Sequence, residues 1–204
     1  MIEVSVLIAT YNYEEYIGEA LDSILSQTFP VERLEVIIVD DGSMDNTMDV
    51  VANYQDRIGL KYIYQDNAGK ASATSRAMKE VCGEYVFVLD ADDYYKNDCI
   101  EKVVSLYKSH PEIVQVSHLA DRLEEGVFIP QTNQNPMAGS PVDGVEMLSG
   151  FINRNWNIGM GSTMSFRATA IIDKEIPQET DMYIDLFLYL VLSGEGNVYQ
   201  MNER

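Results

Sequence analysis

The sequence predicts an α/β fold in which a mainly parallel sheet is flanked by helices. Short apolar runs of strand length alternate with longer segments that have helical apolar spacing through the first half of the chain. A β-α-β order of this kind builds parallel strands joined by helical crossovers. Polar clusters follow three of the apolar runs, and in such a sheet they would share the edge formed by the carboxyl ends of the strands.

The first half of the chain contains four strand-and-helix units and a fifth strand. Strands are predicted at 4–9, 34–39, 60–65, 85–89 and 114–119, where the apolar runs lie. Helices are predicted at 15–26, 45–54, 72–81 and 97–109. We expect Asp45 or Ser43 to cap the second helix and Gly83 to stop the third.

The second half is less regular. Strands are predicted at 127–129, 163–166 and 198–201, and helices at 143–152 and 181–192. Asp143 is the expected cap of the first of these helices. The segment 130–141 is rich in Pro, Gly, Asn and Gln and is typical of a flexible loop.

Composition excludes several classes of protein. The 204 residues are 46% hydrophobic, which suits one globular domain, and the formal net charge is −19. A nucleic-acid partner would require a basic face, so none is expected. The same charge argues against unaided adhesion to anionic lipid. A small anionic ligand stays possible where a metal ion supplies positive charge.

Location and redox state follow from a few features. Cys82 and Cys99 are predicted to be reduced thiols, because a lone pair in a long chain without a secretory signal favours no bridge. The amino terminus lacks the pattern of a signal peptide, and the apolar run 186–192 is too short to span a bilayer. We therefore expect a cytoplasmic protein without a transmembrane segment that is able to work beside the inner face of a membrane.

The segment Asp90-Ala91-Asp92-Asp93 directly follows the apolar run 85–89. Oxygen ligands crowded in this way suit Mg²⁺ or Mn²⁺, and such an ion commonly completes its shell with substrate phosphates. The segment therefore favours a metal–diphosphate site at the tip of a strand. The alternative is a plain acidic turn, since Asp is a common turn residue.

Three motifs together resemble family 2 glycosyltransferases with the GT-A fold. They are VSVLIATYN at 4–12, VIIVDDGSMDNT at 36–47 and GEYVFVLDADD at 83–93. The resemblance covers residues 4–120 well and the rest loosely. It implies inverting transfer of a sugar from a nucleotide diphosphate donor, with a UDP-sugar preferred, to an acceptor hydroxyl on a glycan or lipid-linked glycan. It also implies one domain over 1–204, with a nucleotide-sugar-binding half (1–120) and an acceptor-binding half (121–204).

The resemblance assigns donor contacts to the first two motifs. Tyr11 would stack on the base, with Thr10 or Asn12 hydrogen-bonding nearby, and Asp41 would accept a hydrogen bond from the base. Asp40 is expected to order its loop. Without the resemblance, Tyr11 would be interpreted as covering the sheet edge, and Asp41 as part of a turn.

A glycine-containing loop follows the third predicted strand. Asn67, Gly69 and Lys70 resemble the family's loop near the donor ribose and phosphates, and Lys70 would meet a phosphate. Family members often carry Arg and Asn where this chain has Thr74 and Ser75, so phosphate contacts from that helix are not expected. A solvated surface position is the alternative for Lys70.

In the third motif, Asp90 and Asp92 match the two carboxylates of the family's D-x-D pattern, with Ala91 between them. Asp92 is the first choice for direct ligation of Mg²⁺ or Mn²⁺. Asp90 is expected to reach the donor ribose or sugar, through water on the metal. The cation would neutralise charge on the departing diphosphate.

The resemblance places the catalytic base at the start of a late helix. Asp181 is the preferred candidate and Asp185 the second, and a simple helix cap is the alternative for Asp181. Trp156 and Gly161 resemble the acceptor-side loop, where Trp156 would stack on a sugar ring. A lone Trp is otherwise expected in a core.

Two rival functions stay open. A sugar nucleotidyltransferase also binds nucleotide and metal at a sheet edge, but its usual glycine-rich basic loop is absent after the first strand. A catalytically silent nucleotide-sugar-binding module would explain the incomplete family motifs. Family members commonly continue beyond the equivalent of Arg204, so acceptor-binding or peripheral membrane-binding parts are expected outside this chain.

Overall fold

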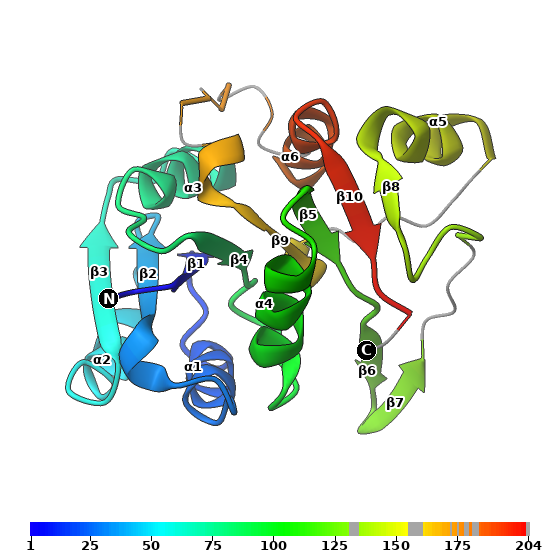
Figure 1. The fold of residues 1–204 in the computed structure, drawn as a ribbon. Coiled ribbons are helices and arrows are strands. Elements are labelled where there is room, and N and C mark those ends of the chain that lie inside the picture. The colour runs from blue at the N-terminus through cyan, green and yellow to red at the C-terminus, as the bar shows by residue number, and fades with distance from the viewer. Residues whose placement is uncertain are drawn as a thin grey trace.

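The computed structural model describes residues 1–130, 135–154, 161–171, 173–174, 176–177, 180 and 184–202. Its main sheet has eight strands in the order β3-β2-β1-β4-β9-β5-β10-β8, and β6 and β7 form a separate hairpin (Figure 1). The strands are β1 (Val4–Thr10), β2 (Leu34–Asp40), β3 (Gly59–Tyr64), β4 (Tyr85–Val88), β5 (Ile113–Ser117), β6 (Asp121–Glu124), β7 (Val127–Pro130), β8 (Pro141–Asp143), β9 (Met164–Arg167) and β10 (Asn197–Gln200).

The strand directions confirm a mainly parallel sheet. β3, β2, β1 and β4 are mutually parallel neighbours, and β10 is parallel to β5. β9 runs antiparallel to both β4 and β5, and β8 runs antiparallel to β10. Because β9 is reversed, its amino end lies at the edge where β1, β2 and β4 have their carboxyl ends.

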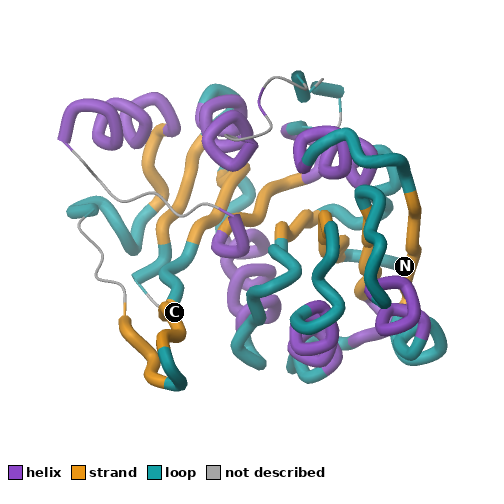
Figure 2. The backbone as a smooth tube through the Cα atoms, turned by 180° about the vertical axis from the view of Figure 1, so that it is seen from behind, coloured by secondary structure: helices purple, strands orange, loops and turns teal. Residues whose placement is uncertain are grey.

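Helices cover both faces of the sheet, as predicted. One face carries α1 (Ile17–Leu25), α2 (Thr47–Ala52) and α4 (Cys99–Ser109), and the other carries α3 (Lys70–Met78), α5 (Gly144–Arg154) and α6 (Ile184–Ser193) (Figures 1 and 2). Short 3₁₀ turns occur at Val31–Arg33, Gly161–Thr163 and Ala168–Ala170. No described helix is long and apolar enough to cross a membrane.

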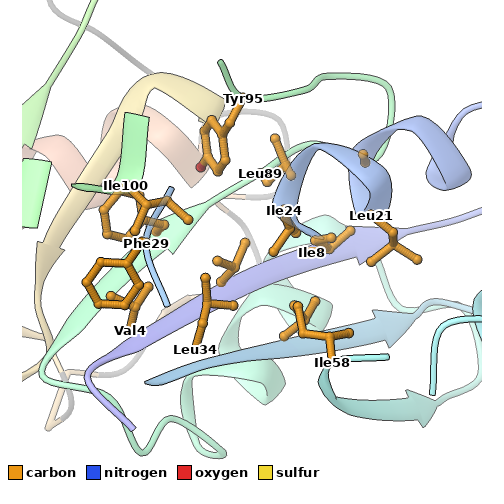
Figure 3. Close-up of a cluster of buried hydrophobic side chains, with 14 of the residues drawn as sticks. Val4, Ile8, Leu21, Ile24, Phe29, Leu34, Ile58, Leu89, Tyr95 and Ile100 are labelled. Atoms are coloured by element: carbon orange, nitrogen blue, oxygen red, sulfur yellow. The ribbon is translucent and has the colours of Figure 1, made fainter. Parts of the chain in front are cut away.

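Alternation along β1 divides the buried side chains between two layers. Val4 and Ile8 belong to the layer under α1 and α4, whereas Leu7 belongs to the layer under α3 and α6. Figure 3 shows the first layer, in which Ile24 of α1 lies near Ile8. Each such buried side chain contributes roughly 1.5–3 kcal/mol to folding. The sheet is therefore anchored on both faces, which fixes the edge where its strands end.

Gly83 does not act as the predicted helix stop. α3 ends at Met78, and Gly83 instead allows close contact with β1, because an added Cβ would lie 2.8 Å from the Ser5 backbone nitrogen. Replacing Gly83 with Ala is expected to lower the free energy of unfolding by about 1–3 kcal/mol, through overpacking against backbone. Chemical denaturation monitored by circular dichroism measures the change.

Gly18, inside α1, is the matched control. An added Cβ there would meet Tyr54 Oη at 3.6 Å, an ordinary contact. Gly18→Ala is therefore expected to be neutral or to stabilise by up to about 1 kcal/mol, because Ala loses less conformational freedom in a helix. A Gly83→Ala protein as stable as Gly18→Ala would contradict the close-contact explanation.

Local capping predictions had mixed outcomes. Asp143 caps α5 as predicted, because its Oδ1 accepts hydrogen bonds from Val145 N at 3.0 Å and Glu146 N at 3.1 Å. The N-cap of α2 is Asn46 and not Asp45 or Ser43, although Asp45 Oδ1 accepts a bond from Thr47 N at 3.1 Å. α2 thus begins at Thr47, two residues after its predicted start.

The two cysteines are free, as predicted. Cys99 lies beside His118, with its Sγ 3.6 Å from His118 Nε2, and Nδ1 of His118 lies 3.0 Å from the Leu119 carbonyl oxygen. Burial raises the pKa of Cys99 to about 12. It also lowers the pKa of His118, against the opposing effect of the Leu119 bond. Both groups are therefore neutral at pH 7.

Protonation of His118 is expected to destabilise the fold. The unfolded imidazole takes up a proton near its ordinary pKa of about 6.5, whereas the folded one does so only at lower pH. Stability from this group is thus complete above that ordinary pKa and is lost as the pH falls toward the folded pKa. Across this window, His118→Asn should lose less unfolding free energy than wild type in denaturant titrations.

Candidate functional site

The carboxyl ends of β1 and β2 meet at one edge of the sheet. Thr10 pairs with Asp40 in the β1–β2 register, and the backbone N–H of Asp41 donates to the Thr10 carbonyl at 2.8 Å. Gln65, which follows β3, donates its backbone N–H to the Asp40 carbonyl at 2.9 Å. The predicted gathering of the polar clusters at one edge is confirmed.

Two adjacent carboxylates organise the loops at this edge. Asp40 accepts bonds from the Ser43 N–H and the Tyr62 hydroxyl, which fits the predicted role in ordering its loop. Asp41 accepts bonds from Gln65 Nε2 at 2.7 Å, Ala68 N at 2.9 Å and Gly69 N at 2.8 Å. The buried Asp41 therefore holds the loop that leads into α3. Its direct contact with a base stays a prediction.

The loop after β1 is tied to the loop after β2. The Asn12 backbone N–H donates to Ser43 Oγ, and Asn12 Oδ1 accepts from the Met44 N–H, each at 2.8 Å. Asn12 has a positive φ of 59°, a conformation that Asn tolerates better than most residues. Tyr11 is exposed, whereas Thr10 is buried and its hydroxyl has no hydrogen-bond partner among the described residues. A flat aromatic face thus stands at the open edge.

Four carboxylates and one lysine lie together beyond β4. Asp90, Asp92 and Asp93 follow this strand, and Lys70 Nζ at the start of α3 lies 2.8 Å from Asp90 Oδ1. A Cβ added to Gly161 would lie 3.2 Å from Asp90 Oδ2 and 3.6 Å from Asp185 Oδ2. The Asp90 and Asp185 carboxylates are therefore close neighbours across Gly161. We call Asp90, Asp92, Asp93 and Asp185 the acidic cluster.

The reversed direction of β9 brings the Gly161 segment to this cluster. Gly161 has a φ of +59° and leads into β9, so it reaches the edge where β4 ends. The next residue, Ser162, accepts a bond from the Asp90 N–H at 2.8 Å and donates one to Asp93 Oδ2 at 2.5 Å. The loop after β4 is thus fixed from the second half of the chain. A larger residue at position 161 would crowd two carboxylates.

Charge and burial shift several pKa values here. Burial by itself lowers the pKa of Lys70, but the charges of Asp90 and Asp185 raise it above its usual range. Burial raises the pKa of Asp185; the Lys70 charge opposes this and the Asp90 charge adds to it. Asp185, in the first turn of α6, is therefore a stronger base than a fully solvated aspartate.

The acidic cluster suits a hard divalent cation. Carboxylate oxygens are the ligands that Mg²⁺ and Mn²⁺ prefer, although the Lys70 ammonium already places positive charge against Asp90. Among the described residues, no group of three or more His, Cys, Asp or Glu side chains could hold a metal ion alone.

Sequence reasoning missed two residues of this site. The charge of Asp92, burial and the charge of Asp90 raise the pKa of Tyr13, which places its hydroxyl near both carboxylates. Tyr13 follows the expected Tyr11-Asn12 pair, and only its position in that loop could have drawn attention to it. Ser162 belongs to the segment 159–162 that resembles the acceptor-side loop, but its bonds to Asp90 and Asp93 could not be predicted, because they depend on the direction of β9.

The remaining predicted site residues have simple positions. Gly69 is the N-cap of α3 with a φ of 91°, and Asn67 is exposed in the same loop. Ala91 is buried between the two D-x-D carboxylates. Asp181 and Trp156 lie outside the described residues.

Two curated proteins with similar sequences are named as glycosyltransferases. TuaG of Bacillus subtilis, provisionally named a teichuronic acid biosynthesis glycosyltransferase, is 40% identical over 211 residues, which cover 98% of this chain and 76% of TuaG. TarS of Staphylococcus aureus, a poly(ribitol-phosphate) β-N-acetylglucosaminyltransferase, is 34% identical over 112 residues, which cover 54% of this chain and 20% of TarS. This chain spans between 20% and 38% of the length of three curated relatives, TarS among them.

Solved structures confirm the predicted GT-A fold. The crystal structure of S. aureus TarS 1–349 with UDP-GlcNAc has a TM-score of 0.82 at 24% identity and covers 100% of this chain and 57% of that one. The Pyrobaculum calidifontis mannosyltransferase PcManGT, in complex with GDP-Man and Mn²⁺, has a TM-score of 0.65 at 22% identity, with 97% and 54% covered. The family model for glycosyl transferase family 2 matches residues 5–173. The chain therefore belongs to glycosyl transferase family 2.

Proposed function

We propose that this chain transfers a sugar from a UDP-sugar to an acceptor hydroxyl, with inversion and with Mg²⁺ or Mn²⁺ as cofactor. The observation that carries the proposal is the meeting of Lys70, Asp90 and Asp185 at the edge that also presents Tyr11. Family membership and the likeness to structures solved with UDP-GlcNAc and with GDP-Man and Mn²⁺ support it.

The donor nucleotide would lie over the carboxyl ends of β1 and β2. Tyr11 is exposed there and would stack on the base, a contact worth roughly 1–3 kcal/mol. Thr10 has an unpartnered hydroxyl nearby among the described residues, and Asn12 lies in the same loop. Asp41 orders the loop containing Asn67 and Gly69, which would face the ribose and phosphates.

The cation would be held by Asp92, with Asp90 beside it. Bound there, it would supply positive charge to the departing diphosphate as a Lewis acid. Lys70 adds a second positive charge at the same place and would contact a phosphate oxygen once one is present. Lys70 and the cation together would place positive charge where negative charge develops, which is the arrangement that lowers such a barrier.

Asp185 would act as the catalytic base. It would take the proton from the acceptor hydroxyl while that oxygen bonds to the anomeric carbon and the bond from this carbon to the diphosphate breaks. Attack from the face opposite the diphosphate inverts the configuration. Its raised pKa suits this role. Asp181, the preferred candidate from the sequence, stays a prediction.

The acceptor side would be formed by the second half of the chain. Gly161 lies between the Asp90 and Asp185 carboxylates, where a larger residue would crowd both, and Trp156 is the predicted stacking platform. The name of TuaG refers to teichuronic acid and that of TarS to poly(ribitol-phosphate), so we propose a polysaccharide or lipid-linked glycan as the acceptor. We place the reaction in the cytoplasm, beside the inner face of the membrane.

Nucleotide-sugar binding and turnover test the proposal. A panel of UDP-, GDP- and TDP-sugars with Mn²⁺ should reveal a UDP-sugar that raises the melting temperature, and a ligand at 100 times its Kd stabilises by about 2.7 kcal/mol. Release of UDP, and an inverted anomeric configuration by NMR, should follow with an acceptor. Pyrophosphate release from a nucleoside triphosphate and a sugar phosphate would favour the nucleotidyltransferase instead. Binding without turnover would favour the silent module.

A further inference from the structure

Lys70 joins the donor loop to the acidic cluster. It is the first residue of α3, directly after Gly69, and its Nζ lies 2.8 Å from Asp90 Oδ1. Both side chains are partly open to solvent, 38% for Lys70 and 29% for Asp90. A surface pair of this kind contributes little to stability. The contact is therefore able to exchange for another without cost to the fold.

The ammonium group of Lys70 supplies positive charge to the acidic cluster, as a bound metal ion would. It neutralises the carboxylate that begins the D-x-D motif, and the charges of Asp185 and Asp92 also act on it. Among the described residues, no other ion pair involves the acidic cluster. A divalent cation that approached Asp90 would thus meet a positive charge already bound there.

A bound nucleoside diphosphate would change the contacts that are open to Lys70 and to the cation. Its phosphates offer Lys70 new oxygen partners and also offer oxygen ligands to the cation. Lysine suits an exchange of partners, because its compact charge sits on a flexible four-carbon stem. Arginine would hold a carboxylate through a rigid two-pronged contact and would exchange less readily.

We propose that Lys70 is an internal counter-ion that weakens metal binding to the acidic cluster until a nucleoside diphosphate is present, and that it then moves from Asp90 to the phosphates. This rests on the proposed function, since it takes Asp92 and Asp90 of the acidic cluster as the residues that hold the metal. Metal and nucleotide would therefore bind with positive coupling, and by linkage each raises the affinity for the other by the same factor.

Titrations with Mn²⁺ alone test the proposal without any turnover. Binding is measured by calorimetry and by the electron paramagnetic resonance signal of free Mn²⁺, for wild type, Lys70→Met and Lys70→Arg. Removal of one positive charge a few ångströms from the metal should raise the affinity of Lys70→Met for Mn²⁺ alone by roughly tenfold or more. Lys70→Arg keeps the charge and should bind Mn²⁺ alone as weakly as wild type.

Lys108→Met is the matched control. Lys108 Nζ lies 3.1 Å from Glu3 Oε2. Because Glu3 directly precedes β1, this pair lies at the edge of the sheet opposite the acidic cluster. Lys108→Met removes the same charge from the whole protein as Lys70→Met, so a general electrostatic effect would raise the Mn²⁺ affinity of both variants equally. Affinity that rises only in Lys70→Met supports a local effect. Thermal melting confirms that each variant is folded.

The second titration adds UDP. In wild type, saturating UDP should raise Mn²⁺ affinity strongly, and in Lys70→Met this enhancement should shrink by roughly tenfold or more. If wild type binds UDP with Mn²⁺ but Lys70→Met binds Mn²⁺ alone no better than wild type does, the counter-ion proposal is wrong and the proposed function stands. If wild type binds no nucleotide with Mn²⁺, the proposed function fails and takes this inference with it.

Discussion

Asp185→Asn is expected to lower kcat by roughly 10²–10⁴-fold, the usual contribution of a general base. The amide has nearly the same size as the carboxylate but cannot accept the proton of the acceptor hydroxyl. Because Asp185 lies across Gly161 from Asp90 and is not expected to contact the nucleotide, the affinity for UDP with Mn²⁺ should stay within a few-fold of wild type. Steady-state kinetics at saturating donor and calorimetric titration with UDP measure the two quantities.

Two further variants make this result specific. Asp49→Asn changes an exposed acid in the first turn of α2, so it matches the chemistry and helix position of Asp185 and should leave kcat unchanged. Asp181→Asn tests the other acidic candidate. If Asp181→Asn removes turnover while Asp185→Asn keeps it, the base is Asp181. Equal donor hydrolysis by wild type and both variants would argue against a base at this position.

Asp92→Ala is expected to abolish the dependence of nucleotide affinity on Mn²⁺. The carboxylate is exposed beyond β4, so its loss should not disturb folding, yet it removes the preferred protein ligand for the cation. UDP titrations with Mn²⁺ and with EDTA should then give the same, weak affinity, whereas wild type should bind much more tightly with the metal. Calorimetry on both proteins provides the comparison.

Asp56→Ala is the control for this experiment. Asp56 is an exposed acid in the turn between α2 and β3, at the opposite edge of the sheet. Its replacement by Ala removes the same charge as Asp92→Ala does. It should retain the full effect of Mn²⁺. Unchanged metal-dependent affinity in Asp92→Ala would show that the D-x-D motif of this chain does not hold the cation.

The sequence predicted the edge of the sheet but not the complete site. Apolar runs located β1, β2 and β4, and parallel topology then placed Tyr11, Asp41 and Asp90 together. Periodicity carries no record of which strands are neighbours or of their direction. The sequence pattern therefore could not predict that the reversed β9 lies between β4 and β5 and brings Ser162 to Asp90.

The predicted bounds of helices and strands were wrong where local hydrogen bonds, and not the apolar pattern, determine where an element begins or ends. α3 begins at Lys70, two residues before its predicted start, where Asp41 fixes the preceding loop. β6 was missed because its residues Asp121–Glu124 are mostly polar. The turn that joins it to β7 uses positive φ angles at Glu125 and Gly126, a geometry that favours two-residue hairpins. Local geometry, not hydrophobicity, defines these elements.

The position of β9 constrains which segments can be exchanged between relatives. A chimera that kept residues 1–120 and took the rest from another family member would import β9, β10 and β8 into the host sheet, with β9 between two host strands. The foreign β9 must pair with β4 of the host on one side and with β5 of the host on the other. Its serine hydroxyl must also reach the host loop that follows β4. Recombination between such enzymes should thus succeed mainly when these three strands are inherited as one block.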